Sequence, residues 1–171
     1  MAKSLLQAKG LVLKQERVIP DYISSYVMGQ FFFDLSLLER SILSQDKSGM
    51  SEYQKKAFQS GKNALKNARK YACDRTETLR LMGLYHWLID RQDKALEWWH
   101  KSIQEGERLG ARVELARTYM EVGKRLLEEK SRFREMDGIN AEDYLKKART
   151  LFETMDLQWD LDELDKIGAY Q

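Results

Sequence analysis

Small residues at the expected crossing of two amphipathic helices constrain this sequence more than any other feature. The stretch Leu79–Leu109 contains two helical patterns of apolar residues that meet at Asp90–Asp93. Gly83 falls in the first pattern and Ala95 in the second, where two antiparallel helices come closest. Helix axes pack about 8–10 Å apart only when a slim residue stands at the crossing. The stretch therefore predicts a tightly packed helical hairpin.

The same arrangement recurs on both sides of this hairpin. Gly29 and Ala116 take the place of Gly83 in a preceding and a following unit, and Ala116 follows Gly83 by 33 residues. The pattern of the second helix returns at Gly61 and at Ala141. The chain also has a single proline and few β-branched runs, so long helices are favoured and sheets are not.

Leu79–Leu109 resembles the tetratricopeptide repeat, a helix–turn–helix unit. Gly83 matches the small position of the first helix of that repeat, and Ala95, Trp99 and Ser102 match the small, aromatic and small positions of the second. The resemblance implies an all-α fold, a right-handed superhelix of about three helix pairs. An extra N-terminal helix and a C-terminal capping helix complete the expected fold.

The whole chain is expected to form one helical-repeat domain. Its expected parts are an extra helix over 1–18, helix pairs over 20–73, 75–109 and 110–156, and a capping helix over 158–170. The segment 1–18 has two interpretations, as a capping helix or as the second helix of a repeat that begins upstream. Trp159, Leu161 and Leu164 are expected to cover the open apolar end of the stack.

Local signals place several helix ends. Ser51 with Gln54, and Asp74 with Glu77, have the spacing of capping boxes that open a helix. Asn140 is a candidate N-cap and Gly110 a candidate C-cap. The residues around Asp137–Asn140 are expected to form a loop.

Composition excludes several classes of protein. A hydrophobic content of 43% with 33% charged residues is typical of a folded helical domain, and the net charge of +2 indicates no global attraction to nucleic acid. The sequence contains no run of about 18 apolar residues, so no membrane span is predicted. The N-terminal stretch carries charges through its apolar part, unlike a signal peptide. The only cysteine, Cys73, suits a reducing compartment, so a cytoplasmic protein is expected.

Ala64–Leu164 is also similar to the C-terminal tetratricopeptide-type region of large bacterial signalling proteins, which follows a kinase, nucleotide-cyclase or AAA-type ATPase module. The likeness is carried by Arg80–Gly83, Ala95–Trp99, Glu107–Arg112, Leu115–Tyr119, Leu151–Met155 and Trp159–Leu161. It implies a regulatory region. No enzymatic activity is implied, because the similarity does not extend to the catalytic modules.

No catalytic, cofactor-binding or metal-binding residues are predicted. His86 and His100 are 14 residues apart and lack the spacing of a metal-binding helix, so His86 is expected to be a packed core residue. Ser60–Lys62 does not form a phosphate-binding loop, because the preceding glycine and strand are missing. The sequence therefore favours a non-enzymatic protein without a cofactor.

The candidate binding surface is the concave face, which the first helices of stacked pairs line. It is predicted to comprise Tyr26, Gln30, Phe33, Asp34, Arg80, Leu84, Trp87, Arg117, Met120 and Glu121. An apolar row flanked by charges suits a protein or peptide with hydrophobic anchors, or another domain of the same larger chain. Two alternatives stay open. The groove can be filled so that these residues are core, or it can be the ligand site of a sensor, with a closed pocket lined by Trp87 and Trp98.

Charge is unevenly distributed between one helix and the tail. The basic helix carries Lys55, Lys56, Lys62, Lys66, Arg69, Lys70 and Arg75, and the acidic tail carries Asp156, Asp160, Asp162, Glu163 and Asp165. These are either two solvated faces or surfaces that steer a charged partner or a second copy of the chain. Nucleic-acid binding is disfavoured, because no aromatic residues alternate with the basic ones.

Overall fold

The computed structural model describes residues 20–45 and 47–169, so the expectations for segment 1–18 lie outside the described residues. This part of the chain is almost entirely helical, as the sequence predicts. Its helices are α2 (Pro20–Leu43), α3 (Lys47–Ala68), α4 (Arg75–Leu88), α5 (Gln92–Leu109), α6 (Arg112–Leu127), α7 (Ala141–Thr154) and α8 (Gln158–Ala169), with a short 3₁₀ turn η1 (Ala72–Asp74) before α4. No helix in these ranges is long and apolar enough to cross a membrane.

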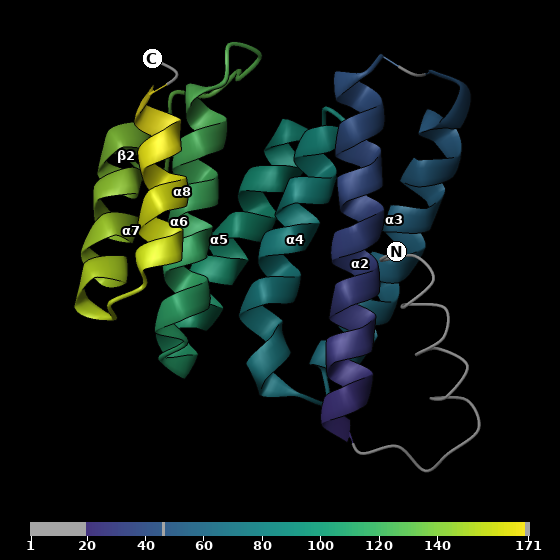
Figure 1. Ribbon diagram of the computed structural model, residues 1–171, viewed down its shortest axis with the longest axis horizontal. Helices are drawn as coiled ribbons and strands as arrows, with labels where there is room; N and C mark the ends of the chain where they lie inside the picture. The colour runs from purple at the N-terminus through teal and green to yellow at the C-terminus, as the bar shows by residue number, and fades with distance from the viewer. Residues whose placement is uncertain (1–19, 46, 170–171) are drawn as a thin grey trace.

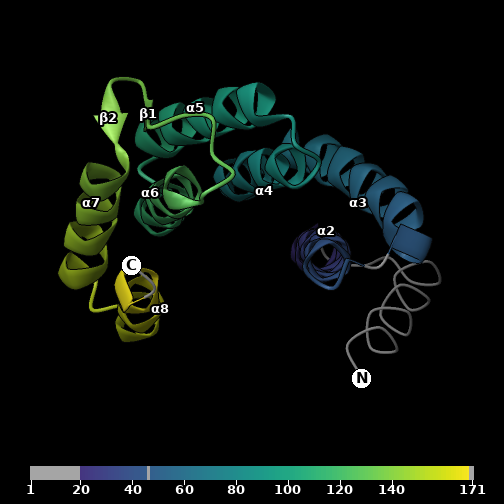
Figure 2. The same cartoon turned by 90° about the horizontal axis from the view of Figure 1, so that it is seen from above.

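Successive helices pack as pairs, and the pairs lie side by side along an arc (Figure 1). The closest neighbours are α2 with α3, α4 with α5, and α6 with α7. Viewed from above, α3, α5 and α7 form the outer side of the arc, and α2, α4, α6 and α8 form the inner side (Figure 2). We call the surface of these four helices on the concave side of the arc the inner face.

Glycines allow the paired helices to approach each other closely. A Cβ atom added to Gly83 would lie 2.2 Å from the indole Nε1 of Trp99, which is one helical turn beyond Ala95. A Cβ atom added to Gly123 would likewise come within 2.7 Å of the Leu145 side chain of α7. The sequence-based expectation of a slim residue at the crossing is therefore confirmed for Gly83.

The apolar core consists of two clusters. The first lies between α2, α3 and α4 and is centred on Phe31, Leu35 and Leu81. The second spans α4 to α8 and includes Trp99 and Tyr144, both 1% exposed or less. Helix α4 contributes to both clusters, because it packs against neighbours on both sides.

One part of the fold departs from the expected absence of strands. Glu135–Met136 (β1) pairs antiparallel with Ile139–Asn140 (β2), and Asp137 and Gly138 form the turn with φ angles of 54° and 73°. Asp-Gly is the sequence signal of such a two-residue hairpin, because both residues tolerate positive φ. The predicted loop is thus a minimal hairpin leading into α7.

Helix ends follow some of the predicted caps and not others. The Asn140 side chain accepts a hydrogen bond from the Asp143 amide at 2.9 Å, and Gly110 ends α5 with a φ of 64°, as predicted. Ser51 does not open a helix, because α3 already begins at Lys47. The Asp74 carboxylate caps no backbone amide, because it accepts hydrogen bonds from the side chains of Asn67 and Ser24 instead.

The C-terminal helix α8 packs on the second cluster through Leu161, Leu164 and Ile167. The sequence predicts that Trp159 helps to cover the apolar end of the stack. This prediction is wrong, because Trp159 is 67% exposed. Asp160, the next residue, is turned toward α6 and is 3% exposed. The helix is therefore fixed by an ion pair on one side and leaves a tryptophan in solvent on another.

Candidate functional site

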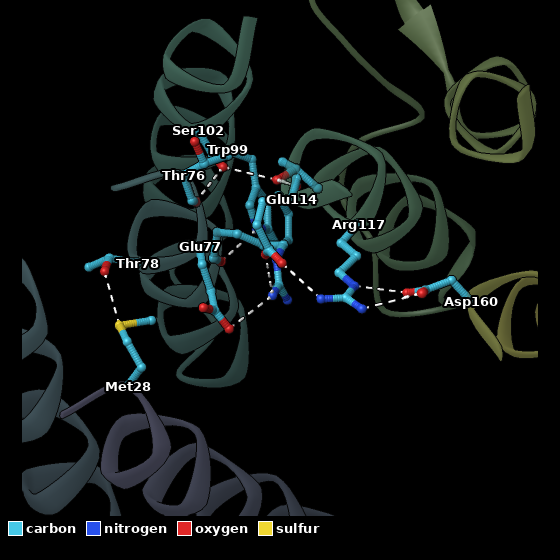
Figure 3. A network of polar contacts seen from close by, with 11 residues as sticks. Met28, Thr76, Glu77, Thr78, Trp99, Ser102, Glu114, Arg117 and Asp160 are labelled. Atoms are coloured by element: carbon cyan, nitrogen blue, oxygen red, sulfur yellow. Dashed lines mark hydrogen bonds and ion pairs between the residues drawn. The ribbon is translucent and has the colours of Figure 1, made fainter. Parts of the chain in front are cut away.

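A continuous chain of ion pairs joins α4, α6 and α8 along the inner face (Figure 3). Arg80 of α4 lies 3.6 Å from Glu77 and donates to Glu114 of α6 at 3.1 Å. Glu114 also accepts from Arg117 at 2.8 Å, and Arg117 reaches Asp160 of α8 with two nitrogens, at 2.8 and 3.2 Å. A bidentate ion pair of this kind fixes the relative orientation of the two side chains as well as their distance. The chain therefore sets the spacing of three inner helices.

The polar network continues into the interior between α4, α5 and α6. The Ser102 hydroxyl donates to the Thr76 carbonyl at 2.8 Å and shares a hydrogen bond of 2.9 Å with the Thr118 hydroxyl. The Trp99 indole donates to the Arg80 carbonyl at 3.1 Å. Because these groups are buried, their bonds hold the backbone that carries Arg80 in place.

Glu77 is the most weakly compensated carboxylate in the ion-pair chain. Burial raises its pKa above the ordinary value, and the nearby charge of Glu114 raises it further, against the opposing effect of Arg80. Its side chain is 34% exposed and its nearest ion-pair contact is the longest in the chain. The negative charge of Glu77 is thus a cost to the folded protein at neutral pH.

Replacing Glu77 with glutamine should therefore stabilise the fold at neutral pH, by about 0.5 kcal/mol after allowance for solvent screening. A raised pKa means that wild type is more stable when Glu77 is protonated, and that this contribution is lost as pH rises through the folded-state pKa. Urea unfolding at pH 7 and at pH 4 should show the gain at pH 7 only. Glu129→Gln, at an exposed site, is the control. Equal gains in the free energy of unfolding at both pH values would contradict the raised pKa of Glu77.

A second charged cluster surrounds Arg125 of α6. Its guanidinium, 6% exposed, contacts Glu121 at 2.7 Å, Glu39 of α2 at 2.8 Å, and Glu128. Burial alone would lower the pKa of Arg125, but the three carboxylates outweigh burial and raise it. The Arg125–Glu39 pair joins residues 86 positions apart, so it connects α2 to α6 across the end of α4.

The structure assigns the ten predicted groove residues to different environments. Arg80, Arg117 and Glu121 belong to the ion-paired clusters of the inner face. Leu84 is 8% exposed, and Met120 packs against the second apolar cluster. The inner face thus has more charge and less apolar surface than the sequence suggested.

Trp87, predicted at the centre of an open groove, is part of the core. It is 1% exposed, its ring lies 5.5 Å from that of Trp99, and its indole donates to Glu128 at 2.8 Å. The end of α4 packs between α5 and α6, so this ring faces the second cluster and not the hollow. The interpretation of Trp87 as a groove anchor is therefore corrected in favour of the core alternative.

Four predicted residues of α2 are rotated away from the side of the helix that pairs with α6. Glu39 marks the side of α2 that faces α6, because it pairs with Arg125. At 3.6 residues per turn, the predicted positions are rotated from Glu39 by about 120–180°. They are Tyr26, Gln30, Phe33 and Asp34, of which Asp34 is buried and accepts a hydrogen bond from Gln30 at 3.0 Å.

Phe32 is the aromatic residue of α2 that sequence reasoning missed. It precedes Glu39 by seven residues, so the two differ by about 20° around the helix and share a side. Phe32 is 57% exposed, whereas Phe31 is fully buried. The run of three phenylalanines was the signal, but choosing among them requires knowing which side of α2 faces its neighbours.

Trp98 lines a hollow on the outer side of the arc. The hollow has a volume of about 270 Å³ and is formed by α3, α4 and α5, without Trp87. The ligand-sensor hypothesis requires one pocket lined by both Trp87 and Trp98. The hollow beside Trp98 does not meet this requirement. His86 stacks on Trp98 with ring centroids 6.2 Å apart, and burial, with help from Lys94 and Arg91, lowers its pKa.

Comparison with known proteins adds no assignment, because no family model, curated protein or solved structure matches this chain. Among residues 20–45 and 47–169, no three or more His, Cys, Asp and Glu side chains group in a way that could hold a metal ion.

Proposed function

We propose that this chain is a non-enzymatic protein-interaction module, a superhelical array of tetratricopeptide-like helix pairs whose inner face binds a protein segment. The observation that carries the proposal is the arc of helix pairs, with α2, α4, α6 and α8 on its concave side (Figure 2). Helix-pair arrays use such concave surfaces to bind extended or helical segments.

The chemistry of the inner face supports an interaction role. Phe32 offers an exposed ring, and isolated aromatic side chains are common anchors of protein interfaces. The inner helices also carry charges whose positions are fixed by ion pairs, Glu39 with Arg125 and Glu77 with Arg80. An exposed ring on a face that carries fixed charges suits a partner with one apolar anchor and flanking polar groups.

A regulatory role in a bacterial signalling protein is part of the same proposal. Its support is the similarity of Ala64–Leu164 to the repeat regions that follow kinase, cyclase or ATPase modules. The partner is then a protein, a peptide or another domain of the same larger chain. Cys73, the only cysteine in the sequence, is exposed and is compatible with a reducing, cytoplasmic location, which we include in the proposal.

A peptide-display selection on the full chain tests the inner face as the binding surface. Peptides enriched on wild type should bind Phe32→Ala at least about tenfold more weakly, because the aromatic anchor is lost. Phe58→Ala is the matched control, since Phe58 is also an exposed phenylalanine, at 42%, but lies on the outer helix α3. Peptides that bind Phe32→Ala as tightly as wild type, or that lose affinity only for Phe58→Ala, would overturn the proposal.

A further inference from the structure

A strip of basic residues lies on the outer side of the arc. Lys62 and Lys66 are exposed on α3, and Arg69 is exposed one residue beyond its end. Lys66 and Arg69 lie four and seven residues after Lys62, so the three share one side of the chain there. In the described part of the chain, none of the three forms an ion pair. Lys62 lies over the ring of Phe58 at 4.9 Å, and Lys101 of α5 lies over Trp98 at 5.1 Å.

An apolar hollow lies beside this strip. Its walls include Leu65, Leu79 and Trp98, and Arg69 and Arg75 stand at its rim. We call this hollow and the basic strip together the outer groove. One acidic residue, Glu105, also lines the hollow, but its charge is already compensated. A hydrogen bond from Arg108, with a further one from Arg75, lowers the pKa of Glu105 to about 2.

The opposite end of the arc carries a surface of complementary character. Trp159 near the start of α8 is 67% exposed, and nothing in the described fold covers it. Asp162 and Glu163 follow it by three and four residues, so they lie beside it on the same side of α8, where Glu163 also forms an ion pair with Lys166. Asp156 is exposed in the turn just before α8. We call Trp159 and these three carboxylates the α8 tip.

We propose that the outer groove of one copy of this chain binds the α8 tip of a second copy. In this contact the Trp159 indole enters the hollow beside Trp98. Asp162 and Glu163 then lie against the basic strip, whose charges form no ion pair with residues 20–45 or 47–169 of the same chain. The contact accounts for three features that the fold leaves unexplained, namely an exposed tryptophan, an acidic helix end and a basic outer strip.

The contact must form between copies, because the two surfaces lie at different ends of the arc (Figure 2). Different surfaces meet in it, so each copy keeps one free groove and one free tip after the first contact. Such head-to-tail association continues until a ring closes or a filament grows. Because charge pairs hold part of it, raising salt from about 0.1 M to about 1 M should weaken it.

Analytical ultracentrifugation with two kinds of variant tests the proposal. Trp159→Ala removes the aromatic ring of the α8 tip, and the double variant Lys62→Glu with Arg69→Glu reverses the charge of the outer groove. All three residues are exposed, so both variants should keep the fold, which circular dichroism can verify. We expect wild type to associate with rising concentration and each variant alone to associate at least about tenfold more weakly. Mixed together, the two variants should form a one-to-one dimer, because one intact tip and one intact groove remain.

Controls separate this proposal from that for the inner face. Phe32→Ala should associate like wild type, and so should Lys124→Glu, a charge reversal at an exposed site of α6. Wild type that stays monomeric up to its solubility limit would overturn the proposal, as would variants that fail to form the mixed dimer. Binding of a single-stranded oligonucleotide to the outer groove, with no loss of affinity in Trp159→Ala and no self-association, would assign the groove to nucleic acid instead.

Discussion

Replacing Arg125 with methionine is expected to lower the free energy of unfolding by about 3–5 kcal/mol, the range for breaking a buried ion pair from one side. The substitution keeps most of the apolar stem and removes the guanidinium, which holds Glu39, Glu121 and Glu128 together. Glu121, only 14% exposed, would then keep its charge without this partner. Urea unfolding at pH 7 measures the loss, and Arg134→Met, at an exposed site, is the control.

The effect of Arg125→Met should also depend on pH. Burial alone would raise the pKa of Glu121, but the charges of Arg125, Lys124 and Arg80, together with the hydrogen bond from Arg125, outweigh burial and hold this pKa below its usual value. A lowered pKa contributes stability above the unfolded-state value of about 4.3, and the contribution is lost as pH falls through the folded-state pKa. The difference between wild type and Arg125→Met should therefore narrow on acidification. A difference that stays constant from pH 7 to pH 3 would exclude the proposed role of these carboxylates.

Gly83→Ala is expected to lower the free energy of unfolding by about 2–3 kcal/mol, although alanine is the better helix former. The new methyl group would lie 2.2 Å from Nε1 and 2.4 Å from Cδ1 of Trp99. That ring is fully buried and donates to the Arg80 carbonyl, so moving it costs both packing and a hydrogen bond. For a chain of this length, the melting temperature should fall by about 4–12 °C.

Gly61→Ala is the matched comparison for Gly83→Ala. Its added methyl group would meet the Met82 sulfur at 2.9 Å, and a methionine end can move at little cost. The Phe31 ring, at 3.0 Å, leaves less room, so we expect a change within about 1 kcal/mol. Thermal unfolding followed by circular dichroism compares the two variants. If both melted at the wild-type temperature, the close approach of α4 and α5 would not be essential.

The helical pairing could be predicted because its signals are local. Gly83 and Trp99 are 16 residues apart, and the caps at Gly110 and Asn140 depend only on their own turns. The inner face could not be predicted in the same way. The side of α2 that faces the hollow depends on the contact between Glu39 and Arg125, 86 residues apart, and no periodicity within α2 encodes that contact.

Trp87 is a second case in which contacts between distant parts of the sequence could not be predicted from a local pattern. Its position in the repeat pattern suggested a groove residue, but the neighbours that bury it come from α5 and α6. Its indole also has a carboxylate partner, Glu128, 41 residues later. Burial of a large aromatic residue is decided by which elements meet over it, and a sequence pattern on one helix does not contain that information.

The membership of α4 in both apolar clusters has a mechanical consequence. Leu81 and Met82 of this helix belong to the cluster with α2 and α3, while Trp87 belongs to the cluster that extends to α8. A force that pulls α2 and α3 away would break the contacts of α4 in the first cluster and leave its contacts in the second cluster intact. Tension applied at one end of the molecule is thus transmitted to the other mainly through α4, and the Arg125–Glu39 ion pair is a second connection, directly between α2 and α6.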